Sequence, residues 1–175
     1  MNLDNSMING WLNVFKEQGY TSSHVVRTLK KKFNIKKIGH YGTLDPMASG
    51  VLPLALGEAT KTINFITCNQ KSYSFSINWG KETDTCDKQG KVINESSKRP
   101  NISEIKLAIK NYFLGNIVQT PPIFSAVKVN GKRAYELARK DLKFEIKPKN
   151  INIIKFELLK VISKDKAQFI VSCGP

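Results

Sequence analysis

Residues 39–61 read Gly-His-Tyr-Gly-Thr-Leu-Asp-Pro-Met-Ala-Ser-Gly-Val-Leu-Pro-Leu-Ala-Leu-Gly-Glu-Ala-Thr-Lys. This stretch places one carboxylate, Asp45, in a glycine-rich turn just before an apolar run that is typical of a strand. Glycines permit sharp turns and close approach of a ligand, and Pro46 stiffens the chain directly after the aspartate. Asp-Pro in such a loop is also ordinary turn chemistry. Residue types alone therefore leave Asp45 either a turn former or a catalytic group.

The same stretch closely resembles the catalytic motif of the TruB family, the synthases that make pseudouridine in the T-loop of transfer RNA. Residues 8–16, followed by Gly19 and residues 21–23, are similar to the family's opening strand and its Lys-Pro-x-Gly-x-Thr-Ser loop, with Glu17 in place of the usual proline. Three later segments are similar to its tyrosine motif, its Gly-x-x-Thr-Asp turn and its Ser-Ala-x-Lys segment: residues 71–75, 80–84 and 125–132. The resemblance covers essentially the whole chain.

The resemblance implies an α+β protein with the pseudouridine synthase fold, in which helices flank a mixed, largely antiparallel sheet. It also implies an isomerase that converts uridine 55 of transfer RNA to pseudouridine, with the T-stem and loop as its partner. This isomerisation gains and loses no electrons, so it needs no nicotinamide, flavin or metal. The sequence offers no dinucleotide fingerprint, phosphate-binding loop or clustered His and Cys ligands. We therefore expect no cofactor and no metal site. We also expect a monomer.

Two residues, Asp45 and Tyr73, match catalytic positions of the family, and His40 matches an RNA-binding position. By resemblance, Asp45 either attacks C1′ of the ribose or assists formation of a glycal intermediate, and the sequence leaves both routes open. Tyr73 would stack on the target base and take the C2′ proton, although its alternation with Phe75 and Ile77 fits an ordinary core aromatic equally well. His40 would fill the gap that the flipped uridine leaves in the T-loop, or it only braces a glycine-rich turn.

The resemblance also implies RNA contacts at five basic residues: Lys16, Lys61, Lys128, Lys132 and Arg133. The last three lie in residues 121–149, which match the place of the family's RNA-clamping thumb, a segment expected to order on binding. A basic, solvated hairpin is the alternative for this insertion.

Composition favours one soluble domain over residues 1–175. With 41% hydrophobic residues the chain can bury one core, and no stretch approaches the roughly 20 apolar residues of a membrane span. The first residues lack the basic start and apolar run of a signal peptide. Cys68, Cys86 and Cys173 are odd in number and widely spaced, which predicts free thiols rather than disulfides or a zinc site. These features predict a cytoplasmic protein.

The net charge of +14, from 28 basic and 14 acidic residues, favours a polyanionic partner through phosphate contacts. Only four of the basic residues are arginine, so biased codon usage on a solvated surface is an alternative. The densest cluster, Lys30–32 with Lys36 and Lys37, accompanies an apolar helical stripe: Val25, Val26, Leu29 and Phe33. Its neighbour in the sequence is the Asp45 loop, which favours an RNA-facing patch.

Periodicity predicts the elements of the first half. We expect a strand over 8–15, a helix capped by Ser22 or Ser23, and a strand over 51–56 that Pro53 places at an edge or bulge. A short helical pattern covers 58–67. Residues 71–79 give the clearest signal, because four apolar residues alternate with polar ones: Tyr73, Phe75, Ile77 and Trp79.

In the second half, residues 80–90 are expected to form a polar turn that leads to a short strand at 92–93. A helix capped by Ser103 should end at Gly115, and Asn130-Gly131 predicts a tight hairpin turn before one or two helical turns over 134–139. Two final strands are expected near 151–163 and 166–173. Strands and helices without a βαβ rhythm favour the α+β class.

After Pro175 the TruB family continues through a Gly-x-Tyr-Ile-Arg segment, whose arginine pairs with the catalytic aspartate, and often through a C-terminal RNA-binding domain. We therefore expect the natural polypeptide to be longer than this chain. Two competing functions follow from the residues: an RNA binder without turnover, and a small-molecule nucleosidase. The nucleosidase is disfavoured, because it has little use for a charge of +14 and would pair two carboxylates where Asp45 stands alone.

Overall fold

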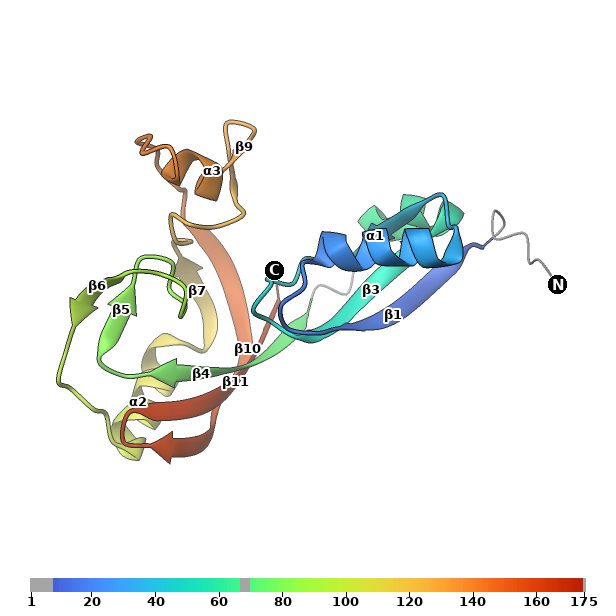
Figure 1. Cartoon of the computed structure of the whole chain (residues 1–175). Coiled ribbons are helices and arrows are strands. Elements are labelled where there is room, and N and C mark those ends of the chain that lie inside the picture. The colour runs from blue at the N-terminus through green and yellow to red at the C-terminus, as the bar shows by residue number, and fades with distance from the viewer. Residues whose placement is uncertain (1–7, 67–69, 175) are drawn as a thin grey trace. The chain divides into compact units, whose positions relative to one another are not determined.

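The structure is a computed structural model that describes residues 8–66 and 70–174, and it divides the chain into two compact units, residues 1–68 and 69–175 (Figure 1). Both units combine helices with antiparallel sheets, which confirms the predicted α+β class. That the two units together form one catalytic domain stays a prediction.

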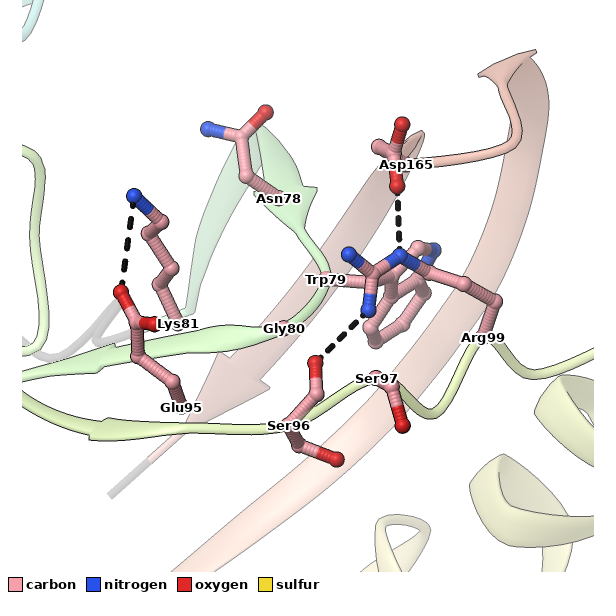
Figure 2. Close-up of a pocket in the computed structure, with 9 residues that line it drawn as sticks. All are labelled: Asn78, Trp79, Gly80, Lys81, Glu95, Ser96, Ser97, Arg99 and Asp165. Carbon is pink, nitrogen blue, oxygen red and sulfur yellow. Dashed lines mark hydrogen bonds and ion pairs between the residues drawn. The ribbon is translucent and has the colours of Figure 1, made fainter.

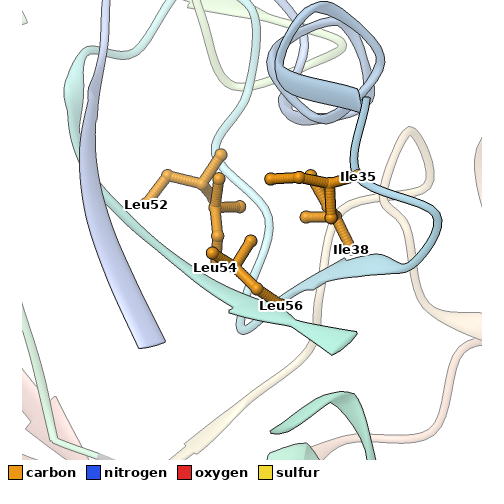
Figure 3. Packing of buried hydrophobic residues seen from close by; sticks show 5 residues of the cluster. All are labelled: Ile35, Ile38, Leu52, Leu54 and Leu56. Atoms are coloured by element: carbon orange, nitrogen blue, oxygen red, sulfur yellow. The ribbon is translucent and has the colours of Figure 1, made fainter. Parts of the chain in front are cut away.

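The first unit is a three-stranded antiparallel sheet with one long helix. Its elements are β1 (Gly10–Lys16), α1 (Ser22–Phe33), β2 (Ile38–His40), β3 (Gly50–Leu56) and a 3₁₀ helix, Gly57–Phe65. The strand order is β1-β3-β2. The core joins alternate residues of β3 to the segment that follows α1, as Figure 3 shows: Ile35, Ile38, Leu52, Leu54 and Leu56. Half-buried Val25, Val26 and Leu29 of α1 pack against this cluster, as their helical spacing predicted.

The expected edge position of the Pro53 strand is wrong, because β3 lies at the centre of its sheet. The N–H and C=O of one strand residue point to the same side, and the carbonyl of Pro53 accepts from the amide of Tyr41 at 2.9 Å. β2 has already ended at His40. The missing proline donor therefore faces the end of a short strand, where no ladder bond is lost.

The cap of α1 also differs from the expectation. Thr21, not Ser22 or Ser23, is the N-cap, and its side chain accepts from the amide of His24 at 3.0 Å. Ser22 is buried and its hydroxyl serves the Asp45 loop instead. Phe33, expected in the apolar stripe, lies exposed at the end of the helix.

The second unit has a four-stranded antiparallel sheet, β4-β11-β10-β7, with α2 on one face. Its strands are β4 (Lys71–Asn78), β7 (Gly115–Gln119), β10 (Lys149–Ser163) and β11 (Lys166–Gly174), and α2 is Ile102–Tyr112. Two small hairpins add β5 (Lys81–Thr83) with β6 (Val92–Glu95), and β8 (Lys128–Val129) with β9 (Lys132–Arg133), which precedes the short helix α3 (Ala134–Ala138). The core is built from Ile105, Ile109, Ala167 and Phe169.

Aromatic rows organise this core. Phe75 of β4 pairs with Phe169 of β11, and their ring centroids are 5.7 Å apart. Phe156 of β10 packs its ring edge against Phe169 at 5.8 Å. The predicted alternation in β4 is therefore confirmed. α2 is capped by Asn101 in a capping box with Glu104 rather than by Ser103.

Candidate active site

Asp45 lies in the loop of residues 41–49 that joins β2 to β3. Its carbonyl accepts from the amide of Ala48 at 3.0 Å, so residues 45–48 form a tight turn with Pro46 in its second position. The Asp45 side chain is exposed. The turn thus uses the backbone of Asp45 and leaves its carboxylate outward.

Three segments hold the backbone on either side of Asp45. The buried hydroxyl of Ser22 accepts from the Leu44 amide at 3.0 Å and donates to the Leu44 carbonyl at 3.1 Å. The amide of Gly19 donates to the Pro46 carbonyl at 2.7 Å. A hydroxyl can donate and accept at once, so one serine satisfies both backbone groups of the residue before the aspartate. The start of α1 therefore fixes the position of the catalytic candidate.

Lys16 is the third support, and its expected role as an RNA contact is wrong. Its side chain is 0% exposed, and its ammonium donates to the carbonyls of Glu17 at 3.0 Å, Tyr20 at 2.8 Å and Ala48. An ammonium has three hydrogens, and all three are used inside the protein. Lys16 therefore joins the end of β1 to the Asp45 turn and presents no charge to a ligand.

The Asp45 carboxylate itself is left to solvent. In the part of the chain that the structure describes, no basic side chain forms an ion pair with it. The polar groups that support the loop, from Lys16, Ser22 and Gly19, all form hydrogen bonds with backbone atoms. This carboxylate is thus positioned through its main chain and stays available to a substrate.

His40 ends β2, opposite Leu54 of β3, and is half-buried. Its Nδ1 hydrogen-bonds the carbonyl of Gly42. Because a carbonyl only accepts, Nδ1 must carry the hydrogen, and this bond fixes the ring's orientation. The bracing role is therefore present in the structure, while stacking on RNA stays a proposal.

Lys61 is exposed on the 3₁₀ helix and forms an ion pair with Glu58, with exposed side-chain fractions of 68% and 65%. The hydrogen bond from Lys61, followed by its charge, lowers the pKa of Glu58 below its usual value, and the charge of Lys37 adds to this. An exposed pair of this kind contributes little to stability, so Lys61 can exchange its carboxylate for a phosphate at small cost.

Tyr73 lies on β4 in the second unit, opposite Val171 of β11. It shares a face with Phe75 and Ile77, which pack against the core, but it is 43% exposed and is not among the residues of that core cluster. The structure therefore favours an accessible aromatic ring over the core role that the sequence left open.

The basic insertion contains the β8–β9 hairpin. Asn130 and Gly131 have φ values of 50° and 82°, so both residues of the two-residue loop are left-handed, and the predicted tight turn is confirmed. Lys128 lies directly opposite Arg133, and Lys132 is exposed beside them. Like charges at opposed positions destabilise a hairpin, and a bound anion relieves that repulsion.

Arg99 lies at the centre of a second group of polar contacts, which the sequence did not predict. Arg99 donates to Asp165, to the Ser96 carbonyl at 2.9 Å and to the Lys98 carbonyl at 3.0 Å. It lines a pocket of about 620 Å³ together with Trp79. Figure 2 shows both side chains among the residues of this pocket. A Cβ on Gly80 would lie 2.5 Å from a guanidinium nitrogen, and its φ is +92°, so the glycine of the Gly-x-x-Thr-Asp turn is required here.

These pocket charges are already paired with each other, because Lys81 also bonds Glu95 at 3.6 Å. Arg99 therefore anchors the β5–β6 hairpin to the turn between β10 and β11. The bond from Arg99 to Asp165 joins residues 66 positions apart in the sequence, so no local sequence pattern could predict it.

Within residues 8–66 and 70–174, no group of three or more His, Cys, Asp or Glu side chains could hold a metal ion. None of the helices described in those ranges is long and apolar enough to cross a membrane. Cys86 and Cys173 are free thiols, whereas Cys68 lies outside the described residues.

Residues 30–175 match the family model described as TruB family pseudouridylate synthase, N-terminal domain. Curated relatives named tRNA pseudouridine synthase B include those of Wolbachia pipientis (49% identical over 96% of this chain and 48% of the relative), Anaplasma phagocytophilum (47%, 96% and 56%) and Bartonella henselae (46%, 95% and 52%). The chain thus spans about half the length of these relatives.

Solved structures show the same fold. A Cbf5-Nop10-Gar1 complex contains a chain that matches with a TM-score of 0.66 at 28% identity, covering 94% of this chain and 39% of that one. An H/ACA RNP bound to a substrate RNA matches with a TM-score of 0.64 at 24% identity, covering 94% and 38%. The fold expected from the sequence is confirmed.

Proposed function

Because this chain belongs to the TruB family of pseudouridylate synthases, we propose that it carries the catalytic centre of an enzyme that converts uridine 55 of transfer RNA to pseudouridine. The observation that carries the proposal is the match of nearly the whole chain to relatives named tRNA pseudouridine synthase B. The outward carboxylate of Asp45, on a turn held by backbone bonds, supports the same reaction.

The reaction breaks the bond between N1 of the base and C1′ of the ribose, and it forms a bond between C5 and C1′. The proton on C5 is released and N1 gains a proton, so the nucleotide is isomerised without an oxidant or reductant. Asp45 either attacks C1′ or assists loss of the C2′ proton on a glycal route. The family resemblance assigns Tyr73 to stacking on the target base and, on the glycal route, to accepting that C2′ proton.

The RNA would be held through its phosphates. Lys61, Lys128, Lys132 and Arg133 are exposed and suited to phosphate contacts, and the charge of +14 favours such binding. His40, whose ring is already oriented by Gly42, supplies a flat surface for the unstacked part of the T-loop. We place this activity in the cytoplasm, on the T-stem and loop, and in a monomer.

Tritium release from transfer RNA labelled at C5 of uridine tests the proposal, because tritium leaves only when the C5–C1′ bond forms. The protein should release one equivalent per transfer RNA. Binding without release would identify the RNA binder instead. Asp45→Asn should abolish release while the dissociation constant for the RNA changes by no more than a few-fold, since the amide keeps the shape and loses the nucleophile. Mass spectrometry must first exclude deamidation of the introduced asparagine back to aspartate. Residual turnover by the variant would then refute the role of Asp45.

A further inference from the structure

Tyr20 and His24 form an exposed aromatic pair at the start of α1. Their ring centroids are 4.8 Å apart and the ring planes differ by 17°, so the rings stack. Tyr20 is 46% exposed, and His24 is also exposed. The side chain of Thr21 accepts from the amide of His24 at 3.0 Å, which fixes the backbone between the two rings. The pair therefore presents flat, exposed aromatic rings at a capped helix start.

This pair is bonded to the turn that carries Asp45. Lys16 donates to the carbonyls of both Tyr20 and Ala48, and Gly19 donates to Pro46. Two independent links therefore join residues 19–20 to residues 46–48. The backbone that carries Tyr20 is therefore bonded directly to the turn that carries Asp45.

The neighbours of the pair along α1 are basic. Arg27 and Lys31 follow His24 at i+3 and i+7, so they lie on the same side of the helix, and both are exposed. The opposite side carries Val25, Val26 and Leu29 into the core. Two flat rings followed by two cations match an unpaired nucleobase and the phosphates of its strand.

We propose that Tyr20 and His24 form a stacking platform for an unpaired base of the RNA substrate, one that is not the base isomerised at Asp45, with Arg27 and Lys31 contacting the adjoining phosphates. This inference rests on the proposed function, since it needs RNA at the Asp45 loop. The competing explanation is a local staple, in which a residue before the N-cap packs against the first turn of the helix. A staple needs only apolar contact, whereas a base needs a flat ring.

Substitutions at Tyr20 separate the two explanations. Binding is measured for Tyr20→Leu and Tyr20→Phe with a T-stem–loop hairpin and with a blunt RNA duplex of equal phosphate number. Tyr20→Leu should weaken hairpin binding about fivefold or more and leave duplex binding unchanged, because one stacked base is lost. Tyr20→Phe, which keeps the ring, should bind both RNAs like the wild type. The matched control is Tyr112→Leu, a tyrosine that is 70% exposed at the end of α2, and it should change neither affinity.

The proposal is overturned if Tyr20→Leu binds the hairpin as the wild type does, loses affinity equally for the duplex, or is matched by Tyr112→Leu. If a thermal melt shows that Tyr20→Leu does not fold, His24→Gln decides, because it removes the second ring from an exposed helix position. Hairpin affinity unchanged in His24→Gln would then refute the platform.

The wild type separates this proposal from the proposed function. If the wild type releases tritium and Tyr20→Leu binds the hairpin normally, only the platform fails. If the wild type binds the hairpin with the expected loss in Tyr20→Leu and releases no tritium, the isomerase assignment fails and the platform stands. If the wild type binds no hairpin, both fail.

Discussion

Replacing Lys16 by methionine should destabilise the first unit and disorder the Asp45 turn. Methionine keeps the unbranched shape of the side chain but removes three charge-assisted hydrogen bonds, to Glu17, Tyr20 and Ala48. Each such bond contributes about 1.5–3 kcal/mol net, and burying the charge costs several kcal/mol that methionine no longer incurs. Because Glu17 and Tyr20 are exposed, water can replace the lysine there, whereas half-buried Ala48 loses its partner. We expect a loss of about 2 kcal/mol, the middle of the range for leaving one buried neutral acceptor without its partner.

Thermal unfolding measures this loss. In a Trp79→Phe background, Trp11 is the remaining tryptophan, and it reports the first unit. For a chain of 175 residues, a loss of about 2 kcal/mol lowers Tm by roughly 4–8 °C. Lys61→Met is the matched control, since Lys61 is exposed and should change the free energy of unfolding by less than about 0.5 kcal/mol. A Tm within about 1 °C of the background for the Lys16 variant would refute the supporting role.

Three further outcomes test other parts of the structure. Tyr73→Phe should lower the tritium-release rate at least about 100-fold with an unchanged melt, because only the hydroxyl is lost, and a normal rate would remove Tyr73 from proton transfer. Gly80→Ala should cost about 1–3 kcal/mol in chemical unfolding, because its Cβ meets a guanidinium and a backbone carbonyl, while Gly131→Ala, with open space around it, should cost less; equal losses would contradict the steric reason. NMR titration should place the pKa of Glu58 below 4.5 and raise it toward that value in Lys61→Met, where only the smaller effect of the Lys37 charge still lowers it. Since the folded pKa is the depressed one, any stability from this pair is present above about pH 4.5 and is lost as the pH falls, and an unshifted Glu58 would show that the pair does not persist in solution.

Local patterns predicted those parts of the molecule whose causes are local. The alternation in β4 needs only neighbouring residues and a sheet with one buried face, and the Asn130-Gly131 turn needs only two left-handed residues. The helix caps were placed one or two residues late, because adjacent Thr, Ser and Asn residues can all serve as caps. Which of them does so depends on what else the hydroxyl can reach, and Ser22 reaches Leu44.

Short strands and buried charges could not be predicted in this way. β2, β5 and β7 have three to five residues, too few for a periodic signal, and their pairing partners supply the reason that they are strands. The family resemblance implied an RNA contact for Lys16, whereas its ammonium is held inside the protein by bonds that include one to Ala48, 32 residues away. A lysine is seldom buried, so nothing in the local sequence indicates this internal role.

The supports of the Asp45 turn and the carboxylate that it presents perform separate tasks, and this separation has a measurable consequence. Ser22, Gly19 and Lys16 all bond backbone atoms of the loop, and none of them bonds the carboxylate. A change in a support should therefore lower stability and activity together, because the turn loses its position. A change in the carboxylate should lower activity alone, because Asp45 is exposed and its side chain supports nothing in the described first unit. Comparing Lys16→Met with Asp45→Asn in the same melt and tritium-release assays tests this separation. If Asp45→Asn lowers Tm as much as Lys16→Met does, the Asp45 carboxylate is part of the scaffold and is not free for the substrate.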